Sequence, residues 1–375
     1  MRLGARLMFG TVLAVILLEC LLRVYNPIQT RVKGNRIVLP ANTQVRFPNK
    51  VIKQLDPIIT VTYNSLGFRG PEPPRDFGNS LTIVVVGSST AECFMLSDGE
   101  TWPDKLSTLL SRSFHDVWVG NAGKDGHSTI AHVILMDDII AGLHPKMVLF
   151  LVGEADVARD RMGRFEAENI KGGLRFDSGK LFLQSLSAHS EIAAAVVALY
   201  RSLTAFQAGL VHSNIDLRAA GEIAIPRDRV REYVATYAKP YYLNAYEARL
   251  KHLIDSARNA GALPVFITQP SLAGPAVDDV TKVDLARVKY MEGISGEMAW
   301  ELLEAYNDVT RRVAHENGVP LIDLAQQMPK SSRYFYDFYH FTNQGAQVSA
   351  DIIYRSLCPF LSGQFKSYVK GGAKQ

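Results

Sequence analysis

The sequence contains five short apolar runs, and each is followed further along the chain by a segment with helical spacing. The runs are LTIVVVG (81–87), VWVGNAG (117–123), MVLFLVG (147–153), LPVFITQP (263–270) and VPLIDLA (319–325). Continuous apolar runs of this length are typical of parallel strands that are buried on both faces. Strands that alternate with helices predict right-handed βαβ crossovers. We therefore expect a three-layer α/β/α fold around a five-stranded parallel sheet of the flavodoxin-like kind.

One long interval interrupts this alternation. Residues 154–238 separate the third run from its helix at 245–261, and they include the amphipathic stretch SEIAAAVVALYRSLTAFQAGL (190–210). Structureless loops of this length are uncommon in compact domains. We therefore expect a helical insertion, which acts as a lid, as a surface for a partner or as packing alone.

The expected boundaries follow from these patterns. The α/β domain covers 81–362, with the insertion inside it, and a turn-rich extension at 28–80 precedes it. A short tail at 363–375 follows.

The first 27 residues, MRLGARLMFGTVLAVILLECLLRVYNP, have the pattern of a membrane segment. Arg2 and Arg6 precede an apolar run over 7–24, which is about long enough to span a bilayer. Glu19 and Arg23 interrupt the run four residues apart, so they can pair on one face of a helix. We expect a transmembrane helix that contacts membrane lipid through residues 7–24.

A cleavable signal peptide is the competing interpretation of this segment. No small-x-small cleavage site follows the apolar run, and the residue before Cys20 is Glu19 rather than a small residue, which disfavours a lipoprotein signal. An uncleaved signal anchor (1–27) is therefore favoured. Arg2 and Arg6 would keep the N-terminus in the cytoplasm and place the rest of the chain outside, on the periplasmic or extracellular face.

Charge and cysteine content exclude several classes of protein. The net charge is +4 and basic residues are interspersed with acidic ones, which argues against a nucleic-acid partner. The cysteines Cys20, Cys93 and Cys358 lie far apart, so neither a disulfide framework nor a CxxC metal site is indicated. No metal-ligand spacing and no phosphate-binding glycine loop of the P-loop type is found, so we expect neither a metal nor a cofactor.

Candidate catalytic residues follow the predicted strands. In doubly wound sheets ligands bind beyond the carboxyl ends of the strands, where the strand order reverses. Ser89 follows the first strand, the turn NAGKDG (121–126) follows the second, and Asp337 and His340 follow the fifth. These residues can meet at one edge of the sheet. We expect Ser89 to act as nucleophile, His340 as general base and Asp337 as the group that orients the imidazole.

These segments resemble the sequence blocks of the SGNH (GDSL-type) hydrolase family. The resemblance covers about 58–362 and is carried by VVVGSST (84–90), NAGKDGHST (121–129), YDFYH (336–340), NSLGFRG (64–70) and ITQP (267–270). The last two recur in membrane-anchored bacterial members. The resemblance implies Ser89 as nucleophile, Gly126 with the Ser89 N–H as oxyanion donors, and Asp337 with His340 as the remaining pair.

The third block departs from the family pattern. The family has G-x-N-D, whose Asn donates to the oxyanion, whereas this chain has Gly153-Glu154-Ala155-Asp156. Loss of one oxyanion donor typically costs about 10²–10³ in rate. The alternatives are a slower enzyme, a donor from elsewhere such as Asn121, which otherwise holds the turn, or a decayed site.

Other polar residues near the carboxyl edge of the predicted sheet are expected to have structural rather than catalytic roles. We expect a solvated or lid-pairing cluster from Glu154, Asp156, Arg159 and Asp160. We expect His127 and His132 to be packing residues, with a substrate contact from His127 as the alternative.

The resemblance implies a membrane-anchored serine esterase that removes O-acyl groups, such as acetyl, from envelope carbohydrate through an acyl-enzyme. One alternative is an O-acyltransferase that modifies a cell-surface polysaccharide together with a multi-pass membrane acyltransferase. A second is a catalytically inactive assembly subunit of a membrane complex, which the Ala155 substitution favours.

Overall fold

The computed structural model describes residues 2–25, 28, 30–34, 36–161, 185–207 and 212–371. The chain divides into two compact units, Met1–Pro40 with Lys171–Val211, and Ala41–Ile170 with His212–Gln375. These units cut across the expected boundaries, because part of the expected insertion belongs with the N-terminal segment. Each unit is described by itself.

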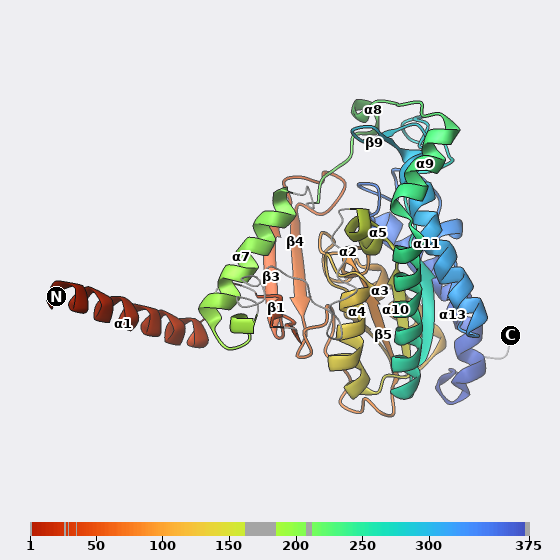
Figure 1. The fold of residues 1–375 in the computed structure, drawn as a ribbon. Helices are drawn as coiled ribbons and strands as arrows, with labels where there is room; N and C mark the ends of the chain where they lie inside the picture. The colour runs from red at the N-terminus through yellow and green to blue at the C-terminus, as the bar shows by residue number, and fades with distance from the viewer. Residues whose placement is uncertain are drawn as a thin grey trace. The chain divides into compact units, whose positions relative to one another are not determined.

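The larger unit is built on the expected five-stranded parallel sheet (Figure 1). Its strands are β5 (Leu81–Gly87), β6 (Val117–Asn121), β7 (Met147–Val152), β8 (Leu263–Thr268) and β11 (Leu321–Ile322). They lie in the order β11-β8-β7-β5-β6, and every pairing is parallel. The chain runs from β5 outward to β6 and then returns to β7 on the other side of β5. The carboxyl ends of β5 and β7 therefore flank the switch point at which ligands bind in such sheets.

Helices cover both faces of this sheet, as expected. α3 (Trp102–Ser113) packs on α13 (Asn343–Gln364) over one face, where Ile83, Val85 and Leu149 join their apolar side chains in one core. α4 (Thr129–Leu135), α10 (Pro240–Asn259) and α11 (Gly296–Glu316) belong to the other layer. α4 continues as a π-helical turn, Met136–Ile140, and a 3₁₀ turn, Ala141–Leu143.

Several short strands were not expected from the sequence. The segment interpreted as irregular contains β3 (Thr43–Pro48), which pairs antiparallel with β4 (Ile58–Tyr63) in the larger unit. A small hairpin of β9 (Lys289–Met291) and β10 (Ile294–Ser295) precedes α11. These strands are short or edge-like, so their sequences lack the continuous apolar runs of the central sheet.

The described part of the expected insertion is helical. It comprises α5 (Glu154–Arg161), α7 (Glu191–Gln207), α8 (Leu217–Ala220) and α9 (Arg227–Tyr237). Residues 162–184 and 208–211 lie outside the described residues. α5, α8 and α9 belong to the larger unit and α7 to the smaller one.

The smaller unit joins the N-terminal helix α1 (Arg2–Val24) to α7, next to the hairpin of β1 (Val32–Lys33) and β2 (Arg36–Ile37). Residues 6–24 of α1 are long and apolar enough to cross a membrane, a property that a signal sequence shares. The expected Glu19–Arg23 pair is present, with Arg23 Nε 3.0 Å from Glu19 Oε1. Glu19 also accepts hydrogen bonds from Ser190 Oγ and from the backbone N–H of Glu191, so it caps the start of α7.

Candidate active site

The turn after β5 presents Ser89 at the edge of the sheet. Ser88 is extended and Ser89 opens the short helix α2 (Ser89–Glu92). Gly87 permits this turn, because a Cβ there would lie 2.6 Å from the Cβ of Ala91. The strand therefore passes directly beneath α2, and the Ser89 side chain is held at its first position.

Two segments that resemble family motifs hold α2 in place. Arg69, from NSLGFRG, is 1% exposed and donates hydrogen bonds to the carbonyls of Glu92 and Cys93 at the end of α2. Gln269, from ITQP, accepts a hydrogen bond from Thr90 Oγ1 at 2.9 Å. A cation at the C-terminal carbonyls of a helix is stabilising, so these contacts position the nucleophile rather than bind substrate.

The structure brings Ser89, His340 and Asp337 together. His340 Nε2 lies 2.7 Å from Ser89 Oγ, and His340 Nδ1 lies 2.7 Å from Asp337 Oδ2. The second oxygen of Asp337 accepts the backbone N–H groups of Tyr339 at 2.9 Å and His340 at 2.8 Å. The D-x-x-H spacing thus folds the loop around its own carboxylate, which fixes the imidazole with one nitrogen toward Asp337 and the other toward Ser89.

The charges around His340 favour its protonated form. Burial alone would lower the pKa of His340, but Asp337 raises it through its charge and its hydrogen bond, and Glu154 and Asp125 add to this, giving a pKa of about 9. Burial would raise the pKa of Asp337, but the charge and hydrogen bond of His340 hold it below its usual value. The pair can therefore stabilise an imidazolium, which general-base chemistry creates.

His212 is a site neighbour that sequence reasoning missed. Its ring lies 4.5 Å from the ring of His340, centroid to centroid, in an edge-to-face arrangement. Its Nδ1 is 2.8 Å from the Tyr336 hydroxyl, and its Nε2 is 3.6 Å from an oxygen of Asp125. His212 stands in no motif, so only the fold could reveal that it packs against the candidate base.

His212, Asp337 and His340 also form a group that could hold a metal ion, because one ligand atom from each lies within 4.8 Å of the others. The sequence showed no such spacing. Asp337 already hydrogen-bonds His340, and His340 also faces Ser89. A metal ion would have to displace these contacts, so we interpret the group as a hydrogen-bonded pair with a flanking imidazole.

The turn after β6 is tied to the nucleophile helix by Glu92. This carboxylate accepts a hydrogen bond from Lys124 Nζ at 2.8 Å and from the backbone N–H of Asp125 at 2.6 Å. Gly123 packs so closely on α2 that a Cβ would lie 2.7 Å from the Glu92 nitrogen. Gly126 follows with a positive φ of 76°, and no described residue accepts a hydrogen bond from its N–H. The turn thus leaves the Gly126 N–H without a described acceptor, and its role as an oxyanion donor stays a prediction.

Asn121 holds this turn. Its amide Nδ2 donates to the Ala91 carbonyl at 2.8 Å, and its Oδ1 accepts the Gly123 N–H at 3.0 Å. Asn121 is 1% exposed. Because both polar groups of the amide are engaged with backbone, we do not propose Asn121 as the substitute oxyanion donor, and we assign it the turn-holding role.

The turn after β7 carries the departure from the family pattern. Ala155 has no side-chain donor, and Glu154 directs Oε2 to within 3.4 Å of Ser88 Oγ, beside the nucleophile. Burial raises the pKa of Glu154 to about 7, against the opposing charge of His340. Glu154 therefore places a carboxyl group that ionises near neutrality beside Ser88. The family pattern has a neutral amide at the next position, which is Ala155 in this chain.

The expectation of a solvated cluster is wrong for Asp156 and Asp160, whereas Glu154 and Arg159 are half-buried. Asp156 is 1% exposed and accepts hydrogen bonds from Thr129 Oγ1 at 2.6 Å and Arg249 Nη2 at 3.1 Å. Asp160 is 3% exposed and accepts one from the Tyr306 hydroxyl at 2.6 Å. α5 packs these carboxylates inward against α10 and α11, so they hold the layers together.

The two histidines after β6 differ in exposure. His132 is 1% exposed, and burial lowers its pKa to about 4, so it is a neutral packing residue as expected. His127 is only partly buried. Neither contacts the Ser89–His340 pair in the described hydrogen bonds, and a role for His127 in substrate contact stays a prediction.

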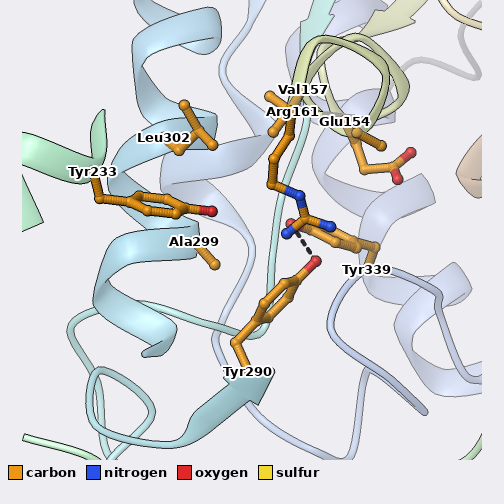
Figure 2. Close-up of a pocket in the computed structure, with 9 residues that line it drawn as sticks. Glu154, Val157, Arg161, Tyr233, Tyr290, Ala299, Leu302 and Tyr339 are labelled. Carbon is orange, nitrogen blue, oxygen red and sulfur yellow. Dashed lines mark hydrogen bonds between the residues drawn. The ribbon is translucent and has the colours of Figure 1, made fainter. Parts of the chain in front are cut away.

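A pocket opens beside the candidate site (Figure 2). It is a small, partly open pocket with a cavity volume of about 20 Å³. The residues that line it are Glu154, Val157, Ala158, Arg161, Tyr233, Tyr290, Ala299, Leu302 and Tyr339. Tyr339 lies between Asp337 and His340 in the chain, so the pocket shares a wall with the catalytic loop.

The model of the GDSL-like lipase/acylhydrolase family matches residues 77–348, which include Ser89, Asp337 and His340. No curated protein matches the chain.

Similar folds among solved structures include LAE5, an alpha/beta hydrolase enzyme from the metagenome of Lake Arreo. It is 15% identical, covers 73% of this chain and 94% of its own, and has a TM-score of 0.41. A lipolytic protein of the G-D-S-L family from Desulfitobacterium hafniense is 10% identical (74% and 100% covered, TM-score 0.41). A catalytic mutant of Axe2, an acetylxylan esterase from Geobacillus stearothermophilus, is 11% identical (74% and 93%, TM-score 0.41).

Proposed function

The chain belongs to the GDSL-like lipase/acylhydrolase family, and from this membership we propose that it is a serine esterase that removes O-acyl groups from carbohydrate of a bacterial cell envelope. The observation that carries the proposal is the continuous hydrogen-bonded chain from Ser89 Oγ through His340 to Asp337, with both contacts at 2.7 Å. Nucleophile, base and orienting acid in this geometry define the activated serine of acyl-transfer enzymes.

The proposed reaction begins with the neutral imidazole. Ser89 Oγ attacks the ester carbonyl carbon while His340 Nε2 accepts the Ser89 proton, and Asp337 stabilises the resulting imidazolium. The backbone N–H groups of Ser89 and Gly126 receive the oxyanion. The imidazolium then protonates the leaving sugar oxygen as its bond to the acyl carbon breaks.

The second half of the reaction regenerates the enzyme. Water gives a proton to His340 and attacks the acyl carbon, and the proton returns to Ser89 as the ester bond to its oxygen breaks. Ala155 removes the third oxyanion donor of the family pattern, so we expect a slower enzyme than one with an amide there.

The proposal places the catalytic unit outside the cytoplasm, anchored by α1. Its support is the apolar length of residues 6–24, the arginines that precede them, and the use of Glu19 to cap α7. Cleavage of α1 would remove that cap, which favours a retained anchor over a signal peptide.

Release of acetate from O-acetylated oligosaccharides by the full chain in detergent tests this proposal. Wild-type protein should release acetate at a rate well above that of the Ser89→Ala variant. Circular dichroism should show that both proteins are folded. Turnover by Ser89→Ala at the wild-type rate would exclude the assigned nucleophile.

Transfer of the acyl group to a sugar hydroxyl, in concert with a multi-pass membrane acyltransferase, uses the same acyl-enzyme and differs only in the acceptor. Excess acceptor sugar should then divert product from free acetate to acylated sugar, whereas a hydrolase continues to release acetate. The proposal of an inactive assembly subunit predicts instead a stoichiometric membrane partner that is retained by the Ser89→Ala variant. The assembled Ser89–His340 contact supports an enzyme over that alternative.

A further inference from the structure

One face of α5 forms a wall of the pocket beside the candidate site. Glu154, Val157, Ala158 and Arg161 line the pocket with the spacing of residues that share a helix face. Glu154 lies at the Ser88 end of this wall, and Arg161 lies two turns further along, roughly 10 Å by the rise of an α-helix. This wall therefore runs from the residue that contacts Ser88 to a guanidinium group.

Arg161 brings a positive charge that the described residues leave without an acidic partner. Its side chain forms no salt bridge to a described Asp or Glu; Nη1 lies 3.3 Å from Met291 Sδ, and the guanidinium carbon lies 5.9 Å from the centre of the Tyr290 ring. Glu154 shares the pocket, but burial raises its pKa to about 7, so at neutral pH its negative charge is only partly present. A guanidinium is well suited to bind a carboxylate through two hydrogen bonds.

Phenol groups surround this guanidinium (Figure 2). The Tyr233 hydroxyl is buried beside the Arg161 guanidinium, and its proton has no acceptor among the described residues. The Tyr290 hydroxyl donates to the Tyr339 hydroxyl at 3.3 Å, which leaves the Tyr339 proton for another acceptor. A buried donor without an acceptor is costly, and an acceptor on a bound ligand would satisfy both Tyr233 and Tyr339.

We propose that this pocket is a subsite for a carboxylate carried by the O-acyl substrate, with Arg161 as its cationic partner and the Tyr233 and Tyr339 hydroxyls as donors. The inference rests on the proposed esterase function and names its substrate class, an acidic rather than a neutral acylated sugar. The carboxylate belongs either to the sugar, as in a hexuronate, or to the acyl group, as in a monoester of a dicarboxylic acid. The recognition chemistry is the same in both cases.

Paired substrates test the proposal in the full chain. O-acetylated hexuronate oligosaccharide is compared with O-acetylated xylo-oligosaccharide, and mono-p-nitrophenyl succinate with p-nitrophenyl butyrate. The Arg161→Gln variant should lose about 10–100-fold in kcat/KM on the acidic member of at least one pair, mainly through KM. The neutral members should change less than about twofold, and the pair that responds identifies the source of the carboxylate.

Arg229→Gln is the matched control, because Arg229 is an exposed arginine of α9 that pairs with Glu232 outside the pocket. It should leave both ratios unchanged. An equal loss on acidic and neutral members in Arg161→Gln, or no loss on either, would overturn the carboxylate subsite.

Binding separates this proposal from the esterase proposal. In the Ser89→Ala background, calorimetry measures the Kd of de-acetylated hexuronate oligosaccharide and of succinate, with neutral xylo-oligosaccharide as control. Addition of Arg161→Gln should weaken binding of one acid about tenfold or more, even if no ester is hydrolysed. Failure of both acids to bind overturns the subsite, whereas acid binding without any turnover overturns only the esterase.

Tyr233→Phe distinguishes ligand binding from packing. Removal of a buried hydroxyl whose proton has no acceptor should leave Tm unchanged or raise it by up to about 1–3 °C. The same change should weaken acid binding several-fold if the hydroxyl donates to the ligand. An unchanged or raised Tm with unchanged affinity would remove Tyr233 from the subsite.

Discussion

The side of the site that holds Ser89 against His340 and the side that we propose receives the oxyanion differ in completeness. On the first side, Ser89, His340 and Asp337 form an unbroken hydrogen-bonded chain. On the second side, Ala155 offers no donor and Glu154 brings a buried carboxyl beside Ser88. We therefore expect nucleophile activation and transition-state stabilisation to be separable by mutation in this protein.

Two carboxylates in the same turn sharpen this contrast. Asp156 is buried with a cation and a hydroxyl as partners, Arg249 and Thr129, so its charge is compensated within the protein. Glu154 has only the hydroxyl of Ser88 as a hydrogen-bond partner among the described residues. The contacts of Asp156 stabilise the fold, whereas the charge of Glu154 acts on His340 and on any bound substrate.

Loss of the base should have the largest effect. His340→Ala should reduce kcat/KM on p-nitrophenyl acetate by about 10⁴-fold or more, and Asp337→Asn by a similar factor, because the nucleophile then keeps its proton. Steady-state kinetics of folded variants measure this. His212→Phe keeps a ring against His340 and should remain within about tenfold of wild type; a greater loss there would mean that the two imidazoles act as a pair.

Removal of the structural carboxylate should affect stability. Asp156→Ala leaves the buried Arg249 guanidinium without its acid, which should lower the free energy of unfolding by about 3–5 kcal/mol. Thermal denaturation followed by circular dichroism measures the change. The control is Asp138→Ala, which removes an exposed carboxylate in the π-helical turn after α4 and should have little effect. Equal Tm values for the two variants would contradict the structural role of Asp156.

Restoration of the missing donor should raise activity. Ala155→Asn supplies an amide where the family pattern has one, and should increase kcat by about 10-fold, with roughly 10²–10³ as the upper limit. Ala155→Asp has the same shape and the opposite electrostatic effect, so it should lower kcat. If both substitutions act alike, the side chain at this position does not face the oxyanion.

Neutralisation of Glu154 should have the smallest effect, and one that depends on pH. The base must be neutral, so kcat/KM should rise as pH increases through the His340 pKa of about 9. The negative charge of Glu154 helps to hold that pKa up. Glu154→Gln should therefore lower the His340 pKa and shift the rise in kcat/KM to lower pH. The variant should then have a several-fold higher kcat/KM than the wild type at pH 7, with little difference above pH 10.

Glu154→Asp retains the charge and is the control for that profile. Its rise should stay near the wild-type position. A Glu154→Gln profile that coincides with the wild type would show that Glu154 does not influence the base.

The central sheet was predictable because burial on both faces leaves a continuous apolar signature. All five strands occur where LTIVVVG and its counterparts predict them. The boundaries between the two units after Pro40 and after Val211 were not predictable. They depend on the assignment of α7 to the N-terminal segment, which rests on tertiary contacts such as that of Glu19 with Glu191. The small strands β1–β4, β9 and β10 carry no comparable pattern.

The meeting of Ser89 with His340 was predictable because both follow parallel strands, whose carboxyl ends share an edge. The burial of Asp156 was not predictable, because its partner Arg249 lies on α10, far along the chain, and no local sequence pattern indicates that contact. His212 was missed for the same reason. Sequence spacing thus reveals groups within one loop, such as Asp337 and His340, better than groups joined only by packing.

Reaction with a fluorophosphonate, followed by peptide mass spectrometry, tests the central claim most directly. The reagent forms a covalent adduct with an activated serine and requires neither a known acyl group nor a complete oxyanion site. We predict one adduct on Ser89 in the wild type, and none in His340→Ala or Ser89→Ala. No adduct on Ser89 in folded wild-type protein, or an equal adduct in His340→Ala, would contradict the account.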